Sequence, residues 1–249
     1  MTALVLALIA GAVVGLALGA LGGGGSVLAV PALIYLLGFT PAAATTAGLI
    51  IVTATSLTAL YAHARAGQVR WKTGAAFAAA GILPAAAAGA AAVHLPQAVL
   101  TSAFAAIAAL AAVNMLRPAD TARPGSGDVR PGRAAGAGAG LGTLTGLLGV
   151  GGGFLAVPAL VTVLAFEMEA AVGTSLLVIT VNSLASLSTR SGAAASLDWA
   201  VIGPFIGAAV LGARDGKRLA TKISGPRLQR VFAVVLLAVA AFMLADAAT

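Results

Sequence analysis

The chain has 249 residues, of which 60% are hydrophobic and 8% are charged, and its mean hydropathy is +1.06. This composition excludes an ordinary soluble domain and predicts an all-α integral membrane protein, because a helix satisfies its own backbone hydrogen bonds in hydrocarbon. The net charge of +7 does not indicate a nucleic-acid partner, since the basic residues lie in short connections between apolar segments. With no cysteine and only His63 and His94, a Cys/His metal centre is excluded, and we expect no metal and no cofactor.

Ten apolar segments follow one another along the chain, five in each half. They cover residues 3–21, 26–37, 43–62, 74–93 and 97–116, and then 134–148, 153–165, 171–189, 199–213 and 228–246. A helix needs about 20 residues to cross the hydrocarbon core, so the short second segment of each half indicates a half-helix or a re-entrant hairpin. Whether the first two segments of each half are full crossings stays open at this stage.

The two halves are copies of one repeat. An offset of 127 residues aligns Gly15–Leu33 with Gly142–Leu160, including a shared Leu-Ala-Val-Pro-Ala-Leu, and then Ala44–Leu57 with Ala171–Leu184. The first segment lacks the basic start of a signal peptide and recurs in the second half. We therefore expect it to be a permanent membrane segment.

A stretch rich in Pro, Gly, Ser and charge separates the two copies, and this composition is typical of a flexible, solvent-exposed linker. The expected division is a first transmembrane repeat in residues 1–116, a cytoplasmic linker in 117–133 and a second transmembrane repeat in 134–249.

The basic residues indicate how the repeats are oriented. Three, four and six of the fourteen Lys and Arg lie in residues 63–73, 117–133 and 214–230, and the remaining one is Arg190. If each half crosses the membrane an odd number of times, these three connections share one side, whereas parallel halves would divide the basic residues eight against six. We therefore expect inverted repeats in the cell inner (cytoplasmic) membrane, with the basic connections in the cytoplasm and both termini on the outer side.

Two glycine clusters interrupt the apolar sequence at equivalent places. Helix-breaking backbone is unfavourable in a membrane unless it is buried in protein or lines a wet cavity, and the free N–H groups of interrupted helices attract anions. Close helix packing through glycine is the structural alternative. We expect the clusters to line a substrate site, with Gly23, Gly24, Gly25 and Ser26 from the first half and Gly151, Gly152 and Gly153 from the second.

The next segment of each half carries hydroxyl and amide side chains on one helical face. A spacing of seven residues places Thr46 near Thr53, and Ser175 near Asn182. Such neutral donors can replace part of an anion's hydration shell, while hydrogen bonding between helices is the structural alternative. These four residues and Thr174 are candidate substrate-binding residues.

His63 and Arg190 are equivalent at the 127-residue offset, and each ends its polar helix. In an inverted pair one would guard the inner mouth and the other the outer mouth, an arrangement that attracts anions. The alternative for both is an interfacial anchor whose polar head reaches the lipid headgroups. Arg190 completes the candidate substrate-binding set.

These motifs resemble the TauE/SafE family of bacterial membrane proteins, described as sulfite or organosulfonate exporters. The pattern G-x-G-G-G-x-L-x-V-P-x-L occurs at Gly149–Leu160 and in looser form at Gly22–Leu33, followed by A-V-G-T-S-L at Ala171–Leu176 and N-S-L at Asn182–Leu184. The resemblance covers nearly the whole chain. It implies secondary transport of a sulfur-containing or related small anion across the cytoplasmic membrane, coupled to an ion gradient, without specifying the anion.

The expected function is a secondary transporter that alternately exposes a midplane anion site between inverted repeats. An anion channel with a Gly-lined neutral pore would use the same residues and is the alternative. An intramembrane enzyme is not expected, because none of the seven acidic residues lies in the middle of an apolar segment. The expected partners are a small anionic substrate and the lipid bilayer; a coupling ion and a homodimer stay open.

Overall fold

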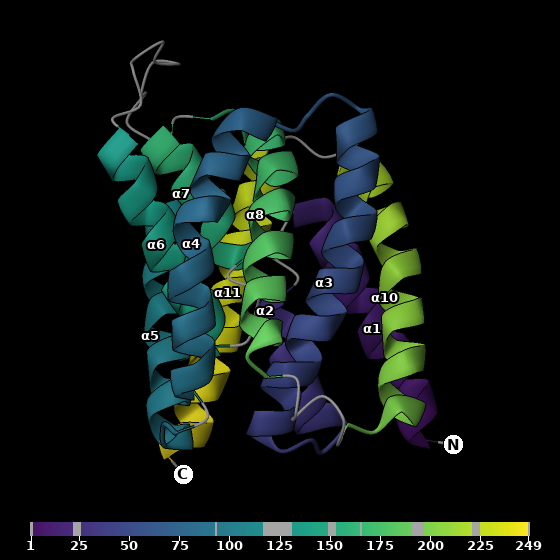
Figure 1. Cartoon of the computed structure of the whole chain (residues 1–249). Coiled ribbons are helices and arrows are strands. Elements are labelled where there is room, and N and C mark those ends of the chain that lie inside the picture. Colours follow the sequence, from purple (N-terminus) through teal and green to yellow (C-terminus); the bar gives the residue numbers. More distant parts are fainter. Residues whose placement is uncertain are drawn as a thin grey trace.

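The computed structural model describes residues 2–21, 26–92, 94–116, 131–148, 153–164, 166–190, 197–220 and 225–248. All regular secondary structure in these ranges is helical, and the helices form one bundle (Figure 1). The first half contains α1 (Thr2–Leu21), α2 (Ser26–Pro31), the π-helix η1 (Ala32–Leu36), α3 (Pro41–Arg65), α4 (Trp71–Ala92) and α5 (Gln97–Leu116). The second half contains α6 (Pro131–Leu148), α7 (Gly153–Leu164), α8 (Met168–Ser188), α10 (Trp199–Ala220) and α11 (Gly225–Ala248). The prediction of an all-α protein is confirmed.

Local sequence signals explain where the central helix α3 begins and ends. Thr40 precedes it, and its side-chain oxygen accepts a hydrogen bond of 3.4 Å from the backbone N–H of Ala43. Pro41 occupies the first helical position, where its missing N–H and fixed φ are well tolerated. Gly67 follows the helix with a φ of +71°, a conformation that favours glycine. The chain can therefore turn sharply into α4.

Two helices extend beyond the apolar segments expected from the sequence. α10 continues to Ala220 instead of ending at residue 213, because charged residues such as Arg214 and Asp215 end an apolar run without ending a helix. α6 begins at Pro131, inside the range expected to be linker, with proline at its favoured first position. Apolarity thus locates these helices better than it locates their ends.

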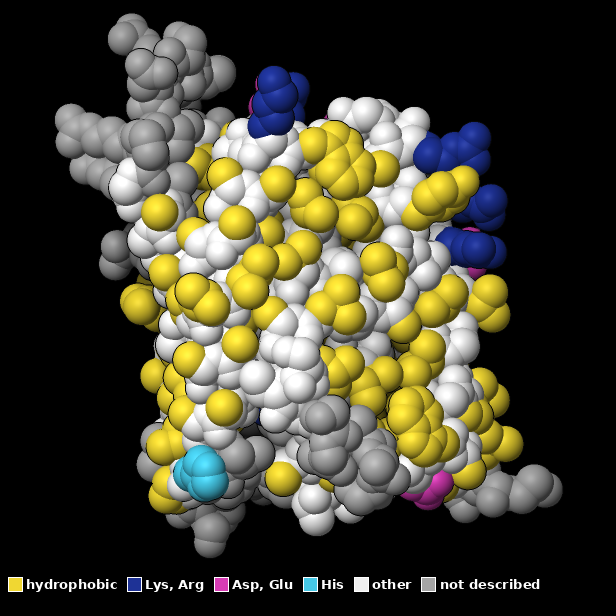
Figure 2. Space-filling view, viewed as in Figure 1, with side chains coloured by type: hydrophobic (Ala, Val, Ile, Leu, Met, Phe, Trp, Pro, Cys, Tyr) yellow, Lys and Arg dark blue, Asp and Glu magenta, His cyan; other side chains and the backbone are white. Residues whose placement is uncertain are grey.

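Several helices are able to cross a membrane. Among the described residues, four helices have the length and apolarity for this: Ala3–Ala20, Ala42–Arg65, Trp71–Ala92 and Met168–Ser188. Both chain termini lie at one end of the bundle (Figure 1), and the visible Lys and Arg side chains gather at the opposite end (Figure 2). Hydrophobic side chains cover much of the surface between the two ends (Figure 2). This distribution is that of a multi-pass membrane protein.

Helices of the first half pack on helices of the second half. α1, from the first half, packs on α10 from the second, and α6, from the second half, packs on α4 from the first. Glycines make both contacts close. A Cβ atom added at Gly11, Gly15 or Gly19 of α1 would overlap the carbonyl oxygens of Phe205, Ala209 and Ala213, respectively, on α10. The same addition at Gly138, Gly142 or Gly146 of α6 would overlap those of Phe77, Gly81 and Ala85 on α4.

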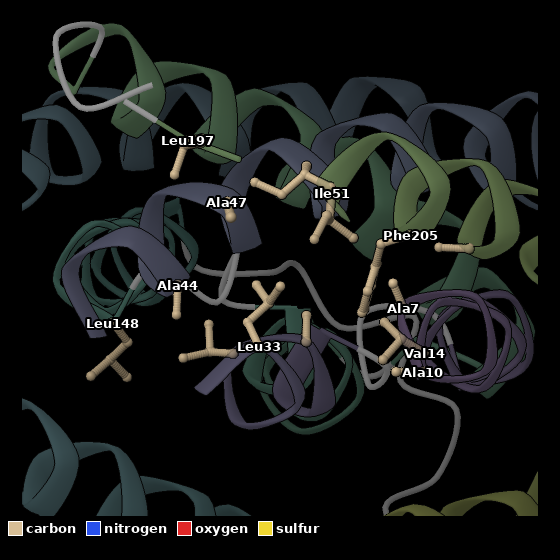
Figure 3. Close-up of a cluster of buried hydrophobic side chains, with 14 of the residues drawn as sticks. Ala7, Ala10, Val14, Leu33, Ala44, Ala47, Ile51, Leu148, Leu197 and Phe205 are labelled. Atoms are coloured by element: carbon tan, nitrogen blue, oxygen red, sulfur yellow. The ribbon is translucent and has the colours of Figure 1, made fainter. Parts of the chain in front are cut away.

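α5 packs on α11, and most of the remaining contacts organise two groups of helices. In the first group, α1, α3 and α10 contact one another, and α2 contacts α1 and α3. In the matching second group, α4, α6 and α8 contact one another, and α7 contacts α6 and α8. Figure 3 shows the apolar core of the first group, where Val14, Leu33, Ile51 and Phe205 converge from α1, η1, α3 and α10. A second core contains Phe77 and buried residues of α7 and α8, together with Leu18 of α1 and residues of α3 such as Val52. α3 and α8 pack on each other and join the two groups.

α3 and α8 run antiparallel where they meet. Near the start of α3, Thr45 receives a hydrogen bond of 3.1 Å from Arg190 just beyond α8. Further along, Ser56 Oγ lies 2.8 Å from Thr180 Oγ1. Residue numbers therefore rise along α3 as they fall along α8.

Candidate anion-binding site

The predicted site residues of the glycine clusters fall largely outside the part of the chain that the structure describes. Gly23, Gly24 and Gly25 lie outside the described residues, as do Gly151 and Gly152. Ser26 and Gly153 are the first residues of α2 and α7. The glycine-cluster part of the predicted site thus stays a prediction.

Three of the predicted hydroxyl residues donate to their own helices. Each is buried, and its side-chain oxygen lies within hydrogen-bond distance of a carbonyl oxygen in the preceding turn. The distances are 3.1 Å from Thr46 to Ala42, 2.7 Å from Thr53 to Leu49 and 2.7 Å from Ser175 to Val172. Because each hydroxyl has a single proton, donation to an anion would require it to rotate away from that carbonyl.

Thr174 anchors the connection between α3 and α4. Its side-chain oxygen accepts a hydrogen bond of 3.0 Å from the backbone N–H of Arg70. The preceding Gly173 allows the connection to come close, since a Cβ there would lie 2.6 Å from the carbonyl oxygen of Gln68. The Gly-Thr pair therefore holds this connection against the start of α8.

Replacement of Thr174 by valine is expected to destabilise the folded protein by about 1 to 2 kcal/mol, because it removes the acceptor from the Arg70 N–H while preserving side-chain shape. The thermal midpoint in detergent measures the effect. Thr143→Val is the matched control, because the hydroxyl of Thr143 donates to the carbonyl of Ala139 on its own helix and holds no other segment of the described structure. Equal midpoints for the two variants would contradict an anchoring role.

Asn182 is the most unusual of the predicted residues. Its side chain is fully buried, and neither amide atom has a hydrogen-bond partner among the described residues. It lies where α8 meets α4 and α6: a Cβ added at Gly81 would be 2.7 Å from both Asn182 amide atoms and 2.9 Å from the carbonyl oxygen of Gly138. A buried amide without partners is unfavourable by about 1 to 3 kcal/mol per group, which suggests a ligand or water between these helices.

Three more buried polar atoms of this kind lie along the end of α8 and just beyond it. Ser183 Oγ, Ser186 Oγ and Arg190 Nε are buried and lack hydrogen-bond partners within the described ranges. Asn182, Ser183 and Ser186 fall within an arc of about 100° on the helix, and Arg190 follows Ser186 at the next spacing of four. We call Asn182, Ser183, Ser186 and Arg190 the α8 donor stripe.

Arg190 is a buried cation just beyond the end of α8, with 5% of its surface exposed. It donates to the carbonyl oxygen of Gly146 on α6 at 2.6 Å and to Thr45 on α3 at 3.1 Å. Burial lowers the pKa of its guanidinium from the ordinary value by desolvation, yet an arginine stays charged at neutral pH. In the described structure the only ion pair joins Arg218 and Asp215, so no carboxylate neutralises Arg190. An anionic ligand would supply the missing charge.

Two equivalent residues of the first half have hydrogen-bond partners within the protein itself. Thr55, in the place of Asn182, donates to the carbonyl oxygen of Ile51 at 2.7 Å. Ser56, in the place of Ser183, contacts Thr180 at 2.8 Å. Unsatisfied donors are therefore concentrated in the second half.

The sequence of this chain matches a known family and two known proteins over most of its length. The profile of the family described as "Sulfite exporter TauE/SafE" matches residues 7–243. The chain belongs to the TauE/SafE family. It is 34% identical over 242 residues to a "Probable membrane transporter protein" of Xylella fastidiosa strain 9a5c, which covers 94% of this chain and 92% of the relative. A protein of the same description from strain Temecula1 gives the same identity and coverage, and no solved structure matches significantly.

Membership of the TauE/SafE family confirms the resemblance seen in the sequence and identifies the chain as a membrane transporter. Two members of the donor stripe, Ser183 and Ser186, were not among the predicted site residues. The regular spacing Asn182, Ser186, Arg190 is the sequence signal that could have revealed Ser186. Among the described residues of this TauE/SafE protein, no group of three His, Cys, Asp or Glu side chains could hold a metal ion.

Proposed function

We propose that the protein is a secondary transporter of the cell inner membrane that carries a small anion, namely sulfite, an organosulfonate or a related sulfur oxyanion. The observation that carries the proposal is the α8 donor stripe, where a buried cation without a carboxylate partner lies beside unsatisfied neutral donors. Membership of a family described as sulfite exporters supports the choice of sulfur oxyanions.

The chemistry of the stripe suits an oxyanion. The amide of Asn182, the hydroxyls of Ser183 and Ser186 and the Nε–H of Arg190 can all donate, and each oxygen of a sulfite or sulfonate group accepts several hydrogen bonds. Neutral donors can replace water around the anion, while the single guanidinium balances its charge. The site would lie in the C-terminal third of α8, displaced from the midplane toward the end of the bundle that holds the chain termini.

Alternating access would use the two matching groups of helices. α3 and α8 are equivalent in the repeat and run antiparallel, which supports inverted repeats. Because α1 packs on α10 and α6 on α4, the moving bodies would each combine helices from both halves. We propose that the group containing α3 rocks against the group containing α8, and that their shared interface opens toward each side in turn.

Uptake into proteoliposomes tests the proposal. Reconstituted protein is expected to take up labelled sulfite or isethionate with a rate that saturates as the concentration rises. A rate that stays proportional to concentration and far exceeds carrier turnover would instead indicate an anion channel. The complete burial of Asn182, Ser183 and Ser186 favours the carrier, since a continuously open pore would expose such groups to water.

Asn182→Ala is expected to raise the KM for the transported anion about tenfold, because one hydrogen bond to a charged ligand contributes about 1.5 to 3 kcal/mol. The measurement is the concentration dependence of initial uptake. Ser188→Ala is the control on the same helix, because Ser188 is exposed and donates only to the carbonyl of Ala185. An unchanged KM for Asn182→Ala would remove this residue from the substrate site.

A further inference from the structure

A second buried polar side chain, His63, lies near the end of α3 that leads into a basic connection. It is 5% exposed, and its Nδ1 atom lies 2.8 Å from Oε1 of Gln68. An amide oxygen only accepts hydrogen bonds, so Nδ1 carries the proton in this contact. The neutral ring therefore has its lone pair on Nε2, which is the atom that a further proton binds.

The other contacts of Gln68 agree with this assignment. Its Nε2 atom donates to Oε2 of Glu169 at 3.4 Å, and a carboxylate accepts from the amide nitrogen and not from its oxygen. The backbone N–H of Gln68 also bonds to the carbonyl of His63 at 3.1 Å. Gln68 thus links the buried imidazole to an exposed carboxylate at the start of α8.

His63 occupies the position in the first repeat that Arg190 occupies in the second. Both lie at the end of a polar central helix and both are 5% exposed. The two residues differ in that Arg190 is charged at every physiological pH, whereas histidine ordinarily gains its charge near pH 6.5. Arg190 therefore places a permanent positive charge at one end of the pair α3 and α8, and His63 places at the other end a charge that depends on its protonation.

The other ionisable side chains that the structure describes near this end of the bundle are exposed, where water screens them. α1 contains none among its residues, and α3 and the following connection contribute Arg65 and Arg70. The exposed charged side chains on the neighbouring elements are Lys72 of α4, Glu167 and Glu169 at the start of α8, and Arg214, Asp215 and Arg218 of α10. Among the described residues, His63 and Arg190 are the buried basic side chains, and His63 is the one at this end of the bundle.

We propose that His63 is the proton-binding residue that couples anion transport to the proton gradient, so that one proton and one anion cross together. This inference rests on the proposed transport function. A proton from the aqueous side binds Nε2 and makes the imidazole cationic, while Nδ1–H remains bonded to Gln68. The charged His63 attracts anions at its end of the bundle, as Arg190 does at the opposite end. By thermodynamic linkage, a bound anion in turn strengthens proton binding to His63. When the anion is released on the other side of the membrane, His63 releases its proton to that side as well.

Accumulation driven by a pH gradient tests the coupling. Proteoliposomes with an alkaline interior, clamped at zero membrane potential, are expected to accumulate isethionate up to about tenfold for one pH unit, because one proton accompanies each anion. His63→Asn retains an N–H near the position of Nδ1 but does not titrate. It is expected to show no accumulation while still exchanging labelled for unlabelled anion across the membrane. The matched control is His94→Asn, because His94 is exposed in a short turn, and it should behave as the wild-type protein.

Each remaining outcome decides between the two proposals. If the wild-type protein exchanges neither isethionate nor sulfite, the transport function fails. If exchange occurs but His63→Asn still accumulates the anion, or if the anion gathers on the acidic side, the coupling role of His63 is wrong and transport stands. If the protein carries only sulfite, a proton bound to sulfite itself also drives accumulation. The difference in accumulation between the wild-type protein and His63→Asn then measures the part that depends on His63.

Discussion

Replacement of Arg190 by glutamine is expected to lower the rate of anion uptake at subsaturating concentration by at least about 100-fold. The guanidinium is buried, has no carboxylate partner in the described structure and ends a row of unsatisfied donors. A loss of this size corresponds to about 2.7 kcal/mol, within the range expected for a hydrogen bond to a charged group combined with loss of the charge itself. Initial uptake of sulfite or isethionate into proteoliposomes measures it.

Two further variants separate binding from folding. Arg190→Lys keeps the charge but cannot reach Gly146 and Thr45 together while also presenting an Nε–H, so it should recover only part of the rate. Arg218→Gln changes an exposed arginine in a surface ion pair and should leave uptake unchanged. If Arg190→Gln transports normally, or if its loss of transport merely follows a loss of folded protein, a role in anion binding is refuted.

Substitution of Gly142 by alanine is expected to destabilise the protein by at least about 2 kcal/mol, through one added methyl group. The new Cβ would lie 2.6 Å from the Cα atom of Gly81 and would overlap that residue's carbonyl oxygen. Backbone atoms in a helix cannot move aside as a side chain can, so α6 and α4 must separate. The thermal midpoint in detergent should fall by about 5 °C or more, followed through the fluorescence of Trp71 and Trp199.

Gly140 provides the control for this substitution on the same helix. It is exposed, and a Cβ added there would meet no atom within 4 Å. Gly140→Ala should leave the midpoint unchanged or raise it, because alanine favours a helix by about 1 kcal/mol relative to glycine. A similar midpoint for both variants would show that the close contact of α6 with α4 does not govern stability.

Much of the helical framework could be predicted because apolarity and repetition act locally. The expected segment 97–116 matches α5, and 74–93 differs from α4 by a few residues. The short second segments appear as α7 and as α2 continued by η1. The helix length needed to cross a membrane and the 127-residue offset were sufficient to locate these elements, because neither depends on which helix packs against which.

Helix partners and satisfied donors could not be predicted in the same way. The sequence around Gly15 and Gly142 indicates that another helix packs closely there. It does not indicate whether the partner of α1 is α4 of the same repeat or α10 of the other, which only the tertiary packing decides. Thr53 and Ser183 are equally polar in sequence. In the structure one donates to its own helix, and the other finds no partner in the described part of the chain. That difference depends on side-chain rotation, which spacing does not encode.

The exchange of helices between halves has a consequence for synthesis. When residues 1–116 have entered the membrane, the glycine face of α1 has no partner, because α10 has yet to be made. α4 likewise has no partner until α6 has been made. The first half is therefore expected to remain loosely assembled in the bilayer until nearly all of the chain has left the ribosome. A gene encoding one repeat alone would produce a stable protein only by pairing with a second copy inserted in the opposite direction.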